Sequence, residues 1–163
     1  MDGVFLGGRP LAAANAEVPL VGQPLGDLWQ ALGVLREYRG DAHVALLTAA
    51  GVGPVEAIQL YAGWQDSVSR RFLQMTRMWD DEAWAAGEAG LRERGWADDQ
   101  GLTNAGMAFR EDLEDRTDQA AAAPWATLGE DRTRRLWDLL RPVAAAAAAG
   151  YPKPPTIPDA MGV

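Results

Sequence analysis

The segment Arg39-Gly40-Asp41-Ala42-His43 places three side chains that can do chemistry within five residues, and it holds the only histidine of the chain. A histidine near a carboxylate and a guanidinium can act as a general base or hold an anionic ligand. The same residues also suit a structural role, in which Asp41 caps a helix and Arg39 pairs with a carboxylate. The chain has no cysteine and no serine patterned with His43, so a catalytic triad has no support. The structural, ligand-binding and catalytic interpretations stay open.

Tryptophan is abundant, and the seven are Trp29, Trp64, Trp79, Trp84, Trp96, Trp125 and Trp137. A surplus of indoles can wall a pocket for an aromatic ligand, although it can equally fill a core among many alanines. Trp29, Trp64 and Trp79 stand near junctions between predicted helices. We therefore expect these three to form, with Arg39 and His43, the site of a small aromatic or hydrophobic ligand.

A second set of candidate site residues is basic. Arg70, Arg71 and Arg77 cluster in one predicted helix, and Arg92 and Arg94 lie at the end of the next. In an alternative interpretation these five side chains contact the phosphates and bases of DNA. They can also pair with acidic side chains on the surface.

Neither a metal nor a cofactor is predicted. The carboxylates fall along solvated helix faces, and the chain lacks the His-x-x-x-His, His-Glu-x-x-His and EF-loop spacings. The glycine pairs at Gly7-Gly8 and around Val52 lack the lysine of a phosphate-binding loop. The sequence therefore gives no indication of a catalytic centre that depends on a metal or a nucleotide cofactor.

The elements that position these residues have the order of a winged helix-turn-helix. Ser67 to Trp79 has an apolar stripe with helical spacing, formed by Val68, Phe72, Met75 and Trp79. Asp80 or Asp81 can cap a second helix that ends at Gly95. A short two-strand ribbon follows over residues 96–102, and Thr103 can cap another helix.

Three predicted helices precede this motif and supply its scaffold. The first begins at Pro24, the second is capped by Asp41 and stops at Gly51, and the third begins at Pro54 and ends before Gly63. Residues 1–22 mix glycine, proline and small side chains, which predicts an extended or loop-like arm.

Two helices are predicted after the ribbon. One runs from Thr103 to about Ala123, where Pro124 ends it, and the last begins near Gly129 with a kink at Pro142. The fold class is therefore mainly α with a small two-strand wing. The predicted domains are an arm over 1–22, a winged-helix domain over 23–150 and a proline-rich tail over 151–163.

Charge opposes DNA binding by this motif. Residues 80–94 contain five acids and two bases, a net charge of −3, and the wing adds Asp98 and Asp99. Each carboxylate within a few ångströms of a phosphate opposes binding by about 1 kcal/mol even in water. Non-specific affinity depends on Lys and Arg that replace counterions. Weak or lost DNA binding is therefore expected.

The overall composition limits the partners and the cellular location that we expect for this protein. The net charge of −8 argues against a general nucleic-acid or anionic-membrane partner. No stretch approaches 18 apolar residues and the start lacks a signal-peptide pattern, so no membrane span or export is expected. The absence of cysteine suits a cytoplasmic protein, and cytoplasmic is the location we expect.

The phrase LRERGWADDQGLTNAG, from Leu91 to Gly106, resembles the L-x-x-R-G and L-T-x-x-G signature of MarR-type winged-helix proteins. The segments Leu28 to Val52 and Glu114 to Gly129 are similar to an actinobacterial MarR-like helix-turn-helix family, and the resemblance covers its C-terminal half. It implies that the terminal helices build a homodimer, or that a separate chain supplies the missing N-terminal half. It also implies a small aromatic effector.

These observations together predict a non-catalytic MarR-like winged-helix protein that binds a small hydrophobic or aromatic ligand, with DNA binding weak or lost. One alternative is a DNA-binding, ligand-responsive transcriptional regulator. Another is a small-molecule biosynthetic enzyme or accessory protein that uses Arg39 and His43.

Overall fold

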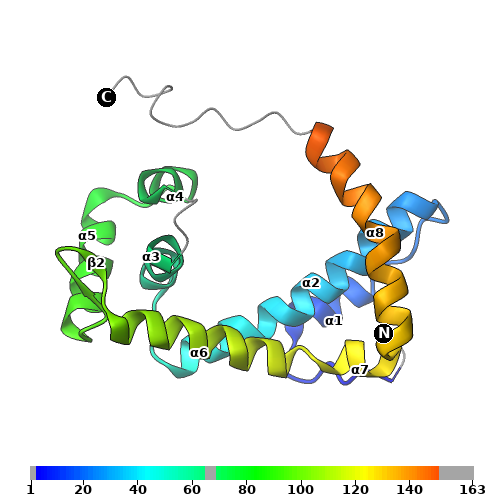
Figure 1. The fold of residues 1–163 in the computed structure, drawn as a ribbon, viewed down its shortest axis with the longest axis horizontal. Coiled ribbons are helices and arrows are strands. Elements are labelled where there is room, and N and C mark those ends of the chain that lie inside the picture. The colour runs from blue at the N-terminus through cyan, green and yellow to red at the C-terminus, as the bar shows by residue number, and fades with distance from the viewer. Residues whose placement is uncertain (1–2, 65–68, 151–163) are drawn as a thin grey trace. The chain divides into compact units, whose positions relative to one another are not determined.

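The computed structural model of this protein describes residues 3–64 and 69–150. They divide into two compact units, one of residues 6–121 and one formed mainly by residues 122–150. In this part of the chain the fold is mainly helical with a two-stranded antiparallel sheet, which confirms that part of the predicted fold class (Figure 1). The elements in order are α1 (Pro10–Ala16), α2 (Pro24–Ala49), α3 (Pro54–Trp64), α4 (Arg70–Thr76), α5 (Asp81–Glu93), β1 (Ala97–Asp98), β2 (Gly101–Leu102), α6 (Asn104–Ala120), α7 (Ala123–Leu128) and α8 (Glu130–Gly150).

Helix α1 lies within the stretch that we expected to be extended or loop-like, so that expectation is wrong. Pro10 stands in the first turn, where its missing N–H would have no helical partner in any case. The next two N–H groups, those of Leu11 and Ala12, donate to the carboxylate of Asp41 at 3.3 and 2.9 Å. The start of α1 is therefore satisfied by a side chain from α2.

Arg9 strengthens this attachment from the residue before α1. Its guanidinium donates to the carbonyl oxygens of Tyr38 in α2 and Ala120 in α6. It also lies over the Tyr38 ring, 3.7 Å from the centroid. The N-terminal segment thus contacts both long helices of its unit.

Helix α2 continues through Asp41, although the sequence predicted a break there and a new helix capped by this residue. The correction has a physical reason. Asp41 is 7% exposed and its carboxylate already accepts the N–H groups of α1, so it cannot cap the backbone of its own helix. The helix ends at Ala49, before Gly51 takes a left-handed φ of 66°.

Helix α3 begins at Pro54, as predicted, and continues through Gly63 to Trp64, whereas α4 is shorter than predicted. The predicted stripe begins at Ser67 and Val68, which lie outside the described residues. Leu73 is the buried apolar side chain of α4, whereas Phe72 and Met75 are 37% and 47% exposed. The predicted apolar face is therefore wrong at Phe72 and Met75, whereas Trp79 packs against buried apolar residues.

Helices α3 and α5 pack closely at Gly87. A Cβ at this position would lie 2.7 Å from both Gln59 Oε1 and Val55 Cγ1. The Gln59 side chain is almost fully buried, and its Nε2 donates to the carbonyl of Trp84 at 2.7 Å. The buried cluster around this contact consists of Val55, Ala62, Leu73 and Trp84, with Ile58 and Trp79 packed against it.

The small sheet pairs Ala97 with Leu102 and Asp98 with Gly101, as the predicted ribbon requires. A second cluster lies beneath it and contains Val52, Leu60 and Leu91, with Trp96, Leu102 and Phe109 among the residues packed on it. The rings of Trp96 and Phe109 stack at 3.9 Å between centroids. Thr103 then caps α6, as predicted, by accepting the Gly106 N–H at 3.2 Å.

The C-terminal elements include a short helix, α7, that the sequence did not predict. Pro124 does not end α6, which stops at Ala120, but stands in the first turn of the short helix α7. Gly129, with a φ of 82°, separates α7 from α8. Helix α8 continues through Pro142 to Gly150, and the predicted tail over 151–163 lies outside the described residues.

Candidate functional site

Helices α4 and α5 with the following sheet form the candidate nucleic-acid surface. Asp80, one of the two predicted caps, is the N-cap of α5, because its carboxylate accepts the Ala83 N–H at 2.7 Å. The second helix of such a motif is the one that enters the major groove. Its exposed positions are Asp81, Glu82, Ala85, Ala86, Ala89, Arg92 and Glu93. Acids and alanines therefore stand where base-reading side chains would be needed.

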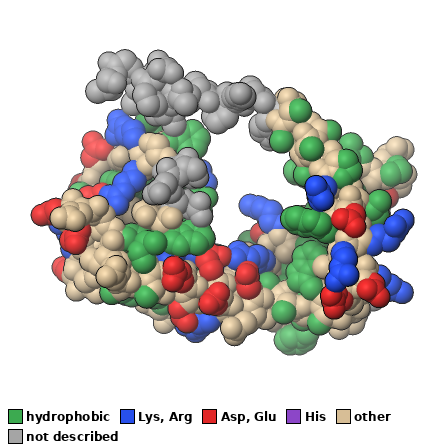
Figure 2. Space-filling view, in the orientation of Figure 1, with side chains coloured by type: hydrophobic (Ala, Val, Ile, Leu, Met, Phe, Trp, Pro, Cys, Tyr) green, Lys and Arg blue, Asp and Glu red, His purple; other side chains and the backbone are tan. Residues whose placement is uncertain are grey.

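Three of the five arginines in the DNA-binding interpretation are paired with acids of the same surface. The pairs are Arg70–Glu88 at 3.6 Å, Arg71–Asp81 at 3.8 Å and Arg92–Asp99 at 2.6 Å. The hydrogen bond to Asp99 raises the pKa of the Arg92 guanidinium. On the face drawn in Figure 2, acidic and basic side chains are interspersed over this part of the chain. The positive charges are thus largely compensated before any ligand binds.

Arg94 makes a different set of contacts. It donates to the carbonyls of Ala50 and Gly51 at 3.2 and 2.6 Å, and its Nε lies 3.5 Å from a carboxylate oxygen of Glu56. Its guanidinium is also 5.0 Å from the ring centroid of Trp96. Arg94 therefore joins the end of α5 to the turn between α2 and α3. The fifth arginine, Arg77, donates to the hydroxyl of Thr76 at 3.2 Å.

The predicted residues Arg39 and His43 lie together on α2 and face α6. Arg39 pairs with Glu114 and with Asp118, the latter at 2.9 Å. The His43 Nδ1 lies 3.1 Å from the Thr117 hydroxyl. Figure 2 shows acidic side chains gathered along this part of α6. The predicted structural interpretation of Arg39, pairing with a carboxylate, is what the structure contains.

A buried arginine extends this polar cluster to Trp64. Arg110 is 5% exposed, pairs with Glu114 and lies 4.8 Å from the ring centroid of Trp64. Burial alone would raise the pKa of Glu114, but hydrogen bonds from Arg39 and Arg110 outweigh it and lower that pKa. Burial alone would likewise lower the pKa of Arg39, which its hydrogen bonds to carboxylates raise instead.

The environment of His43 favours its neutral form. Burial is the main cause that lowers the pKa of this imidazole, opposed by the charge of Glu114 and reinforced by Arg110 and Arg39. A neutral imidazole that contacts a hydroxyl contributes to packing between helices. The cluster therefore consists of groups whose hydrogen bonds and charges are satisfied by one another.

The three tryptophans predicted to share a pocket have different surroundings. Trp29 is 79% exposed and lies ten residues before Arg39 on α2, about 15 Å along the helix axis. Trp64 contacts the polar cluster through Arg110. Trp79 packs on the apolar cluster between α3 and α5. The structure brings Arg39, His43 and Trp64 to one region, while a ligand-binding role for any of the five residues stays a prediction.

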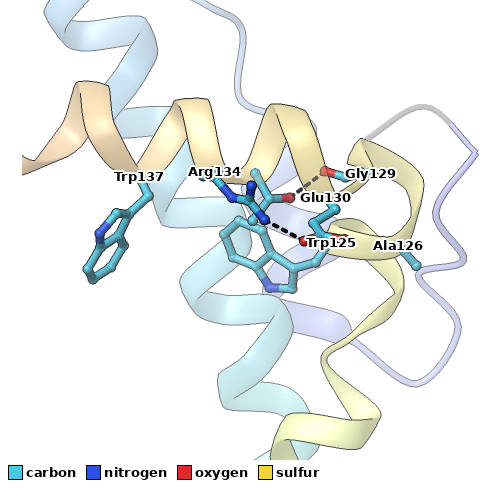
Figure 3. A pocket seen from close by; sticks show the side chains of 7 residues that line it. Trp125, Ala126, Gly129, Glu130, Arg134 and Trp137 are labelled. Carbon is cyan, nitrogen blue, oxygen red and sulfur yellow. Dashed lines mark hydrogen bonds and ion pairs between the residues drawn. The ribbon is translucent and has the colours of Figure 1, made fainter.

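A groove that the sequence did not predict lies between α7 and α8. Its volume is about 600 Å³, and its lining is Trp125, Ala126, Gly129, Glu130, Thr133, Arg134 and Trp137 (Figure 3). Trp125 and Trp137 are 39% and 66% exposed, and Arg134 pairs with Glu130 at 2.5 Å between them. Recognising Pro124 as the first turn of a helix would have placed Trp125 beside α8.

Metal and membrane sites have no support in the part of the chain that the structure covers. No three His, Cys, Asp or Glu side chains in residues 3–64 and 69–150 are grouped to hold a metal ion. No single helix there is long and apolar enough to cross a membrane. Helices α2 and α3 meet that test only as a pair bent by 108°.

The succession of α4, a tight turn, α5, a two-strand wing and α6 defines a helix-turn-helix protein with a small wing. The chain belongs to a helix-turn-helix family, whose model matches residues 1–153. No curated protein and no solved structure matches it. The resemblance in the signature phrase is therefore supported at the level of helix-turn-helix membership.

Proposed function

We propose that this protein is a non-catalytic, MarR-like helix-turn-helix protein that binds a small aromatic ligand and has weak affinity for duplex DNA. The observation that carries the proposal is the pairing of Arg70 and Arg92 with Glu88 and Asp99 on the candidate DNA surface. Counterion release from DNA requires cations that are free to replace counterions at the phosphates. Arginines held by carboxylates provide little of this gain.

We expect the unmodified protein not to retard duplex DNA at physiological salt, and the double variant Glu88→Gln/Asp99→Asn to gain affinity. Two freed arginines that reach phosphates should steepen the dependence of log K on log salt by about two units. Fluorescence anisotropy with a labelled random-sequence duplex, titrated at several salt concentrations, measures both the affinity and the slope.

A matched control is Glu111→Gln/Asp115→Asn, which removes the same charge from exposed positions of α6. This variant should bind DNA no better than the unmodified protein if local pairing is the cause. Sub-micromolar, sequence-dependent binding by the unmodified protein would instead support the second candidate, a conventional DNA-binding regulator. Membership of a helix-turn-helix family favours that candidate.

The ligand-binding half of the proposal is supported by the groove between α7 and α8. Its two indoles offer flat surfaces for stacking, and Arg134 stands between them. Pockets of several hundred cubic ångströms accommodate small ligands. The groove therefore meets the chemical requirements that we had assigned to Trp29, Trp64 and Trp79 with Arg39 and His43.

An aromatic acid such as salicylate is expected to quench tryptophan emission saturably, and Trp137→Ala should weaken its binding by about 0.5–1.5 kcal/mol for lost stacking. Trp29→Ala is the matched control because this indole is exposed to a similar extent on another helix. If Trp29→Ala weakens binding of the aromatic acid and Trp137→Ala does not, the ligand site lies on α2 and not in the groove. No saturable quenching in the unmodified protein would end the ligand proposal.

We also propose that α8 forms a homodimer contact. None of its residues is buried, and Leu139 and Val143 are 55% and 44% exposed with Leu136 and Leu140 beside them on the helix. An apolar stripe of this length is typical of a surface covered by another chain. The alternative partner is a chain that carries the N-terminal half of the family's longer members.

An enzyme or accessory protein built on Arg39 and His43 has weaker support. Arg39 is occupied by Glu114 and Asp118, and His43 contacts Thr117. Groups that satisfy one another hold two helices together and leave little capacity for a substrate. Cytoplasmic location remains part of the proposal.

A further inference from the structure

A polar cavity lies where α5 and the wing meet α3 and the start of α4. Its volume is about 400 Å³, which is in the range of cavities that hold small ligands. The elements around it contact one another within the unit of residues 6–121 (Figure 1). Its lining includes Gln59, Arg70, Glu88, Leu91, Arg92 and Asp99.

Gln59 gives this cavity an unsatisfied acceptor. The residue is 2% exposed and its Nε2 donates to the carbonyl of Trp84 at 2.7 Å, but its Oε1 has no hydrogen-bond partner within the described ranges 3–64 and 69–150. This oxygen faces Gly87, where a Cβ would lie 2.7 Å from it. It therefore points toward the turn of α5 whose Glu88 and Leu91 line the cavity. Because a buried acceptor without a donor costs free energy, a donor from a ligand would be favourable here.

The carboxylates of the cavity already bind guanidinium groups. Glu88 pairs with Arg70 at 3.6 Å, and Asp99 pairs with Arg92 at 2.6 Å. Solvent reaches all four side chains, so each pair contributes little to stability and can exchange its cation. Asp98 also lines the cavity, which gives the lining three acids and two arginines. The excess charge is negative and favours a cationic ligand.

We propose that this cavity binds a small organic cation that carries a guanidinium group. Its N–H groups donate to Gln59 Oε1 and to the carboxylates of Glu88 and Asp99. It thereby replaces Arg70 and Arg92 as the partner of these acids. The five N–H donors of a guanidinium lie in one plane, so a single group can satisfy an amide oxygen and carboxylates together. The site is distinct from the groove between α7 and α8 and does not depend on a ligand there.

Two other classes of ligand fit this cavity less well. A metal ion needs several carboxylate or histidine ligands, and no three such side chains are grouped for one anywhere in the described residues. An anion would need free cations, but Arg70 and Arg92 are already paired. An anion also has no N–H group to donate to Gln59 Oε1. A guanidinium supplies both the donors and the positive charge.

Isothermal titration calorimetry of the full chain with butylguanidine tests the proposal. Saturable binding is expected, and butylurea, which keeps N–H donors but has no charge, should bind about tenfold more weakly. Gln59→Met keeps the length of the side chain but removes the acceptor, so it should weaken butylguanidine binding about tenfold. The double variant Arg70→Gln/Arg92→Gln should instead strengthen binding about threefold or more, because the competing guanidinium groups are gone.

The matched control is the double variant Arg71→Gln/Arg116→Gln. It removes two exposed arginines that pair with Asp81 and Asp112, acids outside the lining of the cavity. This variant should bind butylguanidine about as tightly as the unmodified protein. Trp137→Ala should also leave the affinity unchanged, because this indole lies in the groove between α7 and α8.

Circular dichroism checks that Gln59→Met folds, and the exposed arginines provide a test that does not depend on this buried position. Absence of saturable butylguanidine binding by the unmodified protein would overturn the proposal, as would equally tight binding of butylurea. An affinity that Arg70→Gln/Arg92→Gln leaves unchanged or lowers would overturn it as well. Loss of binding in Trp137→Ala would place the cation in the groove between α7 and α8 instead.

Discussion

Gly106→Ala is expected to destabilise the helix-turn-helix unit by about 3 kcal/mol or more, enough to unfold a marginal domain. A Cβ at this buried position would lie 2.1 Å from the carbonyl oxygen of Trp96. That oxygen accepts the N–H of Thr103, so neither the strand nor the start of α6 can move away without losing a hydrogen bond. Urea unfolding followed by circular dichroism measures the loss.

Ala108→Gly is the control for this variant, since residue 108 is an exposed position of the same helix. It should cost about 1 kcal/mol through helix propensity alone. If Gly106→Ala costs no more than this, the close approach of α6 to the wing is not a constraint. Gly106 ends the signature phrase, and the expected effect gives that glycine a packing reason.

Glu114→Ala is expected to cost about 3 kcal/mol, because it leaves the buried Arg110 without its carboxylate and removes one partner of Arg39. Asp112→Ala is matched to it, since Asp112 belongs to another pair four residues apart on α6 but is exposed. That variant should change the free energy of unfolding by less than about 1 kcal/mol. Equal costs for the two variants would show that burial of Arg110 has no energetic consequence.

Stability should fall in two stages as the pH is lowered from neutral. The folded-state pKa of His43 is below its usual value of about 6.5, so the unfolded chain binds a proton first and stability declines below that pH. The pKa of Glu114 is also depressed, and its contribution is lost as pH falls below about 4.3 through the folded value. Urea midpoints measured from pH 7.5 to 3.5 should show both stages.

His43→Gln isolates the upper stage, because an amide can still contact the Thr117 hydroxyl but does not titrate. The variant should lose the decline below pH 6.5 and retain the one near pH 4. A decline of the same size in both proteins between pH 7 and 5 would assign that stage to another group.

The elements that the sequence predicts well are those whose signals are local. Asp80 and Thr103 cap the helices that follow them, and Gly95 takes the left-handed φ that ends α5. Each of these residues acts within three positions of itself, so its role can be recognised without knowledge of the tertiary fold. The two-strand wing between α5 and α6 could also be predicted, because its short turn is a local signal.

Asp41 shows why other elements could not be predicted. An aspartate can cap its own helix or accept N–H groups from a helix 29 residues away in the sequence. The residues around it are the same in both cases, so the sequence does not distinguish them. The choice depends on the packing of α1 on α2, which no short segment encodes. Trp29, Trp64 and Trp79 have different surroundings for a similar reason, because proximity to helix junctions does not fix which way an indole points.

The polar cluster was predicted in part. Arg39 and His43 are four residues apart on α2, so their common face followed from helical periodicity. Their partners Glu114 and Thr117 come from α6, some 75 positions later. The sequence placed the carboxylates on solvated helix faces and did not single out Thr117. Packing of α2 against α6 pairs Arg39 with the carboxylates of Glu114 and Asp118.

The attachment of α1 has a consequence for any shortened form of this protein. Asp41 and the carbonyl of Tyr38 receive donors from residues 9–12. A chain that begins at residue 23 would retain the buried acceptors and lose every one of these donors. Residues 9–12 thus connect α2 to α6 and stabilise the contact between these helices. The glycine and proline content of the first segment does not indicate this structural role.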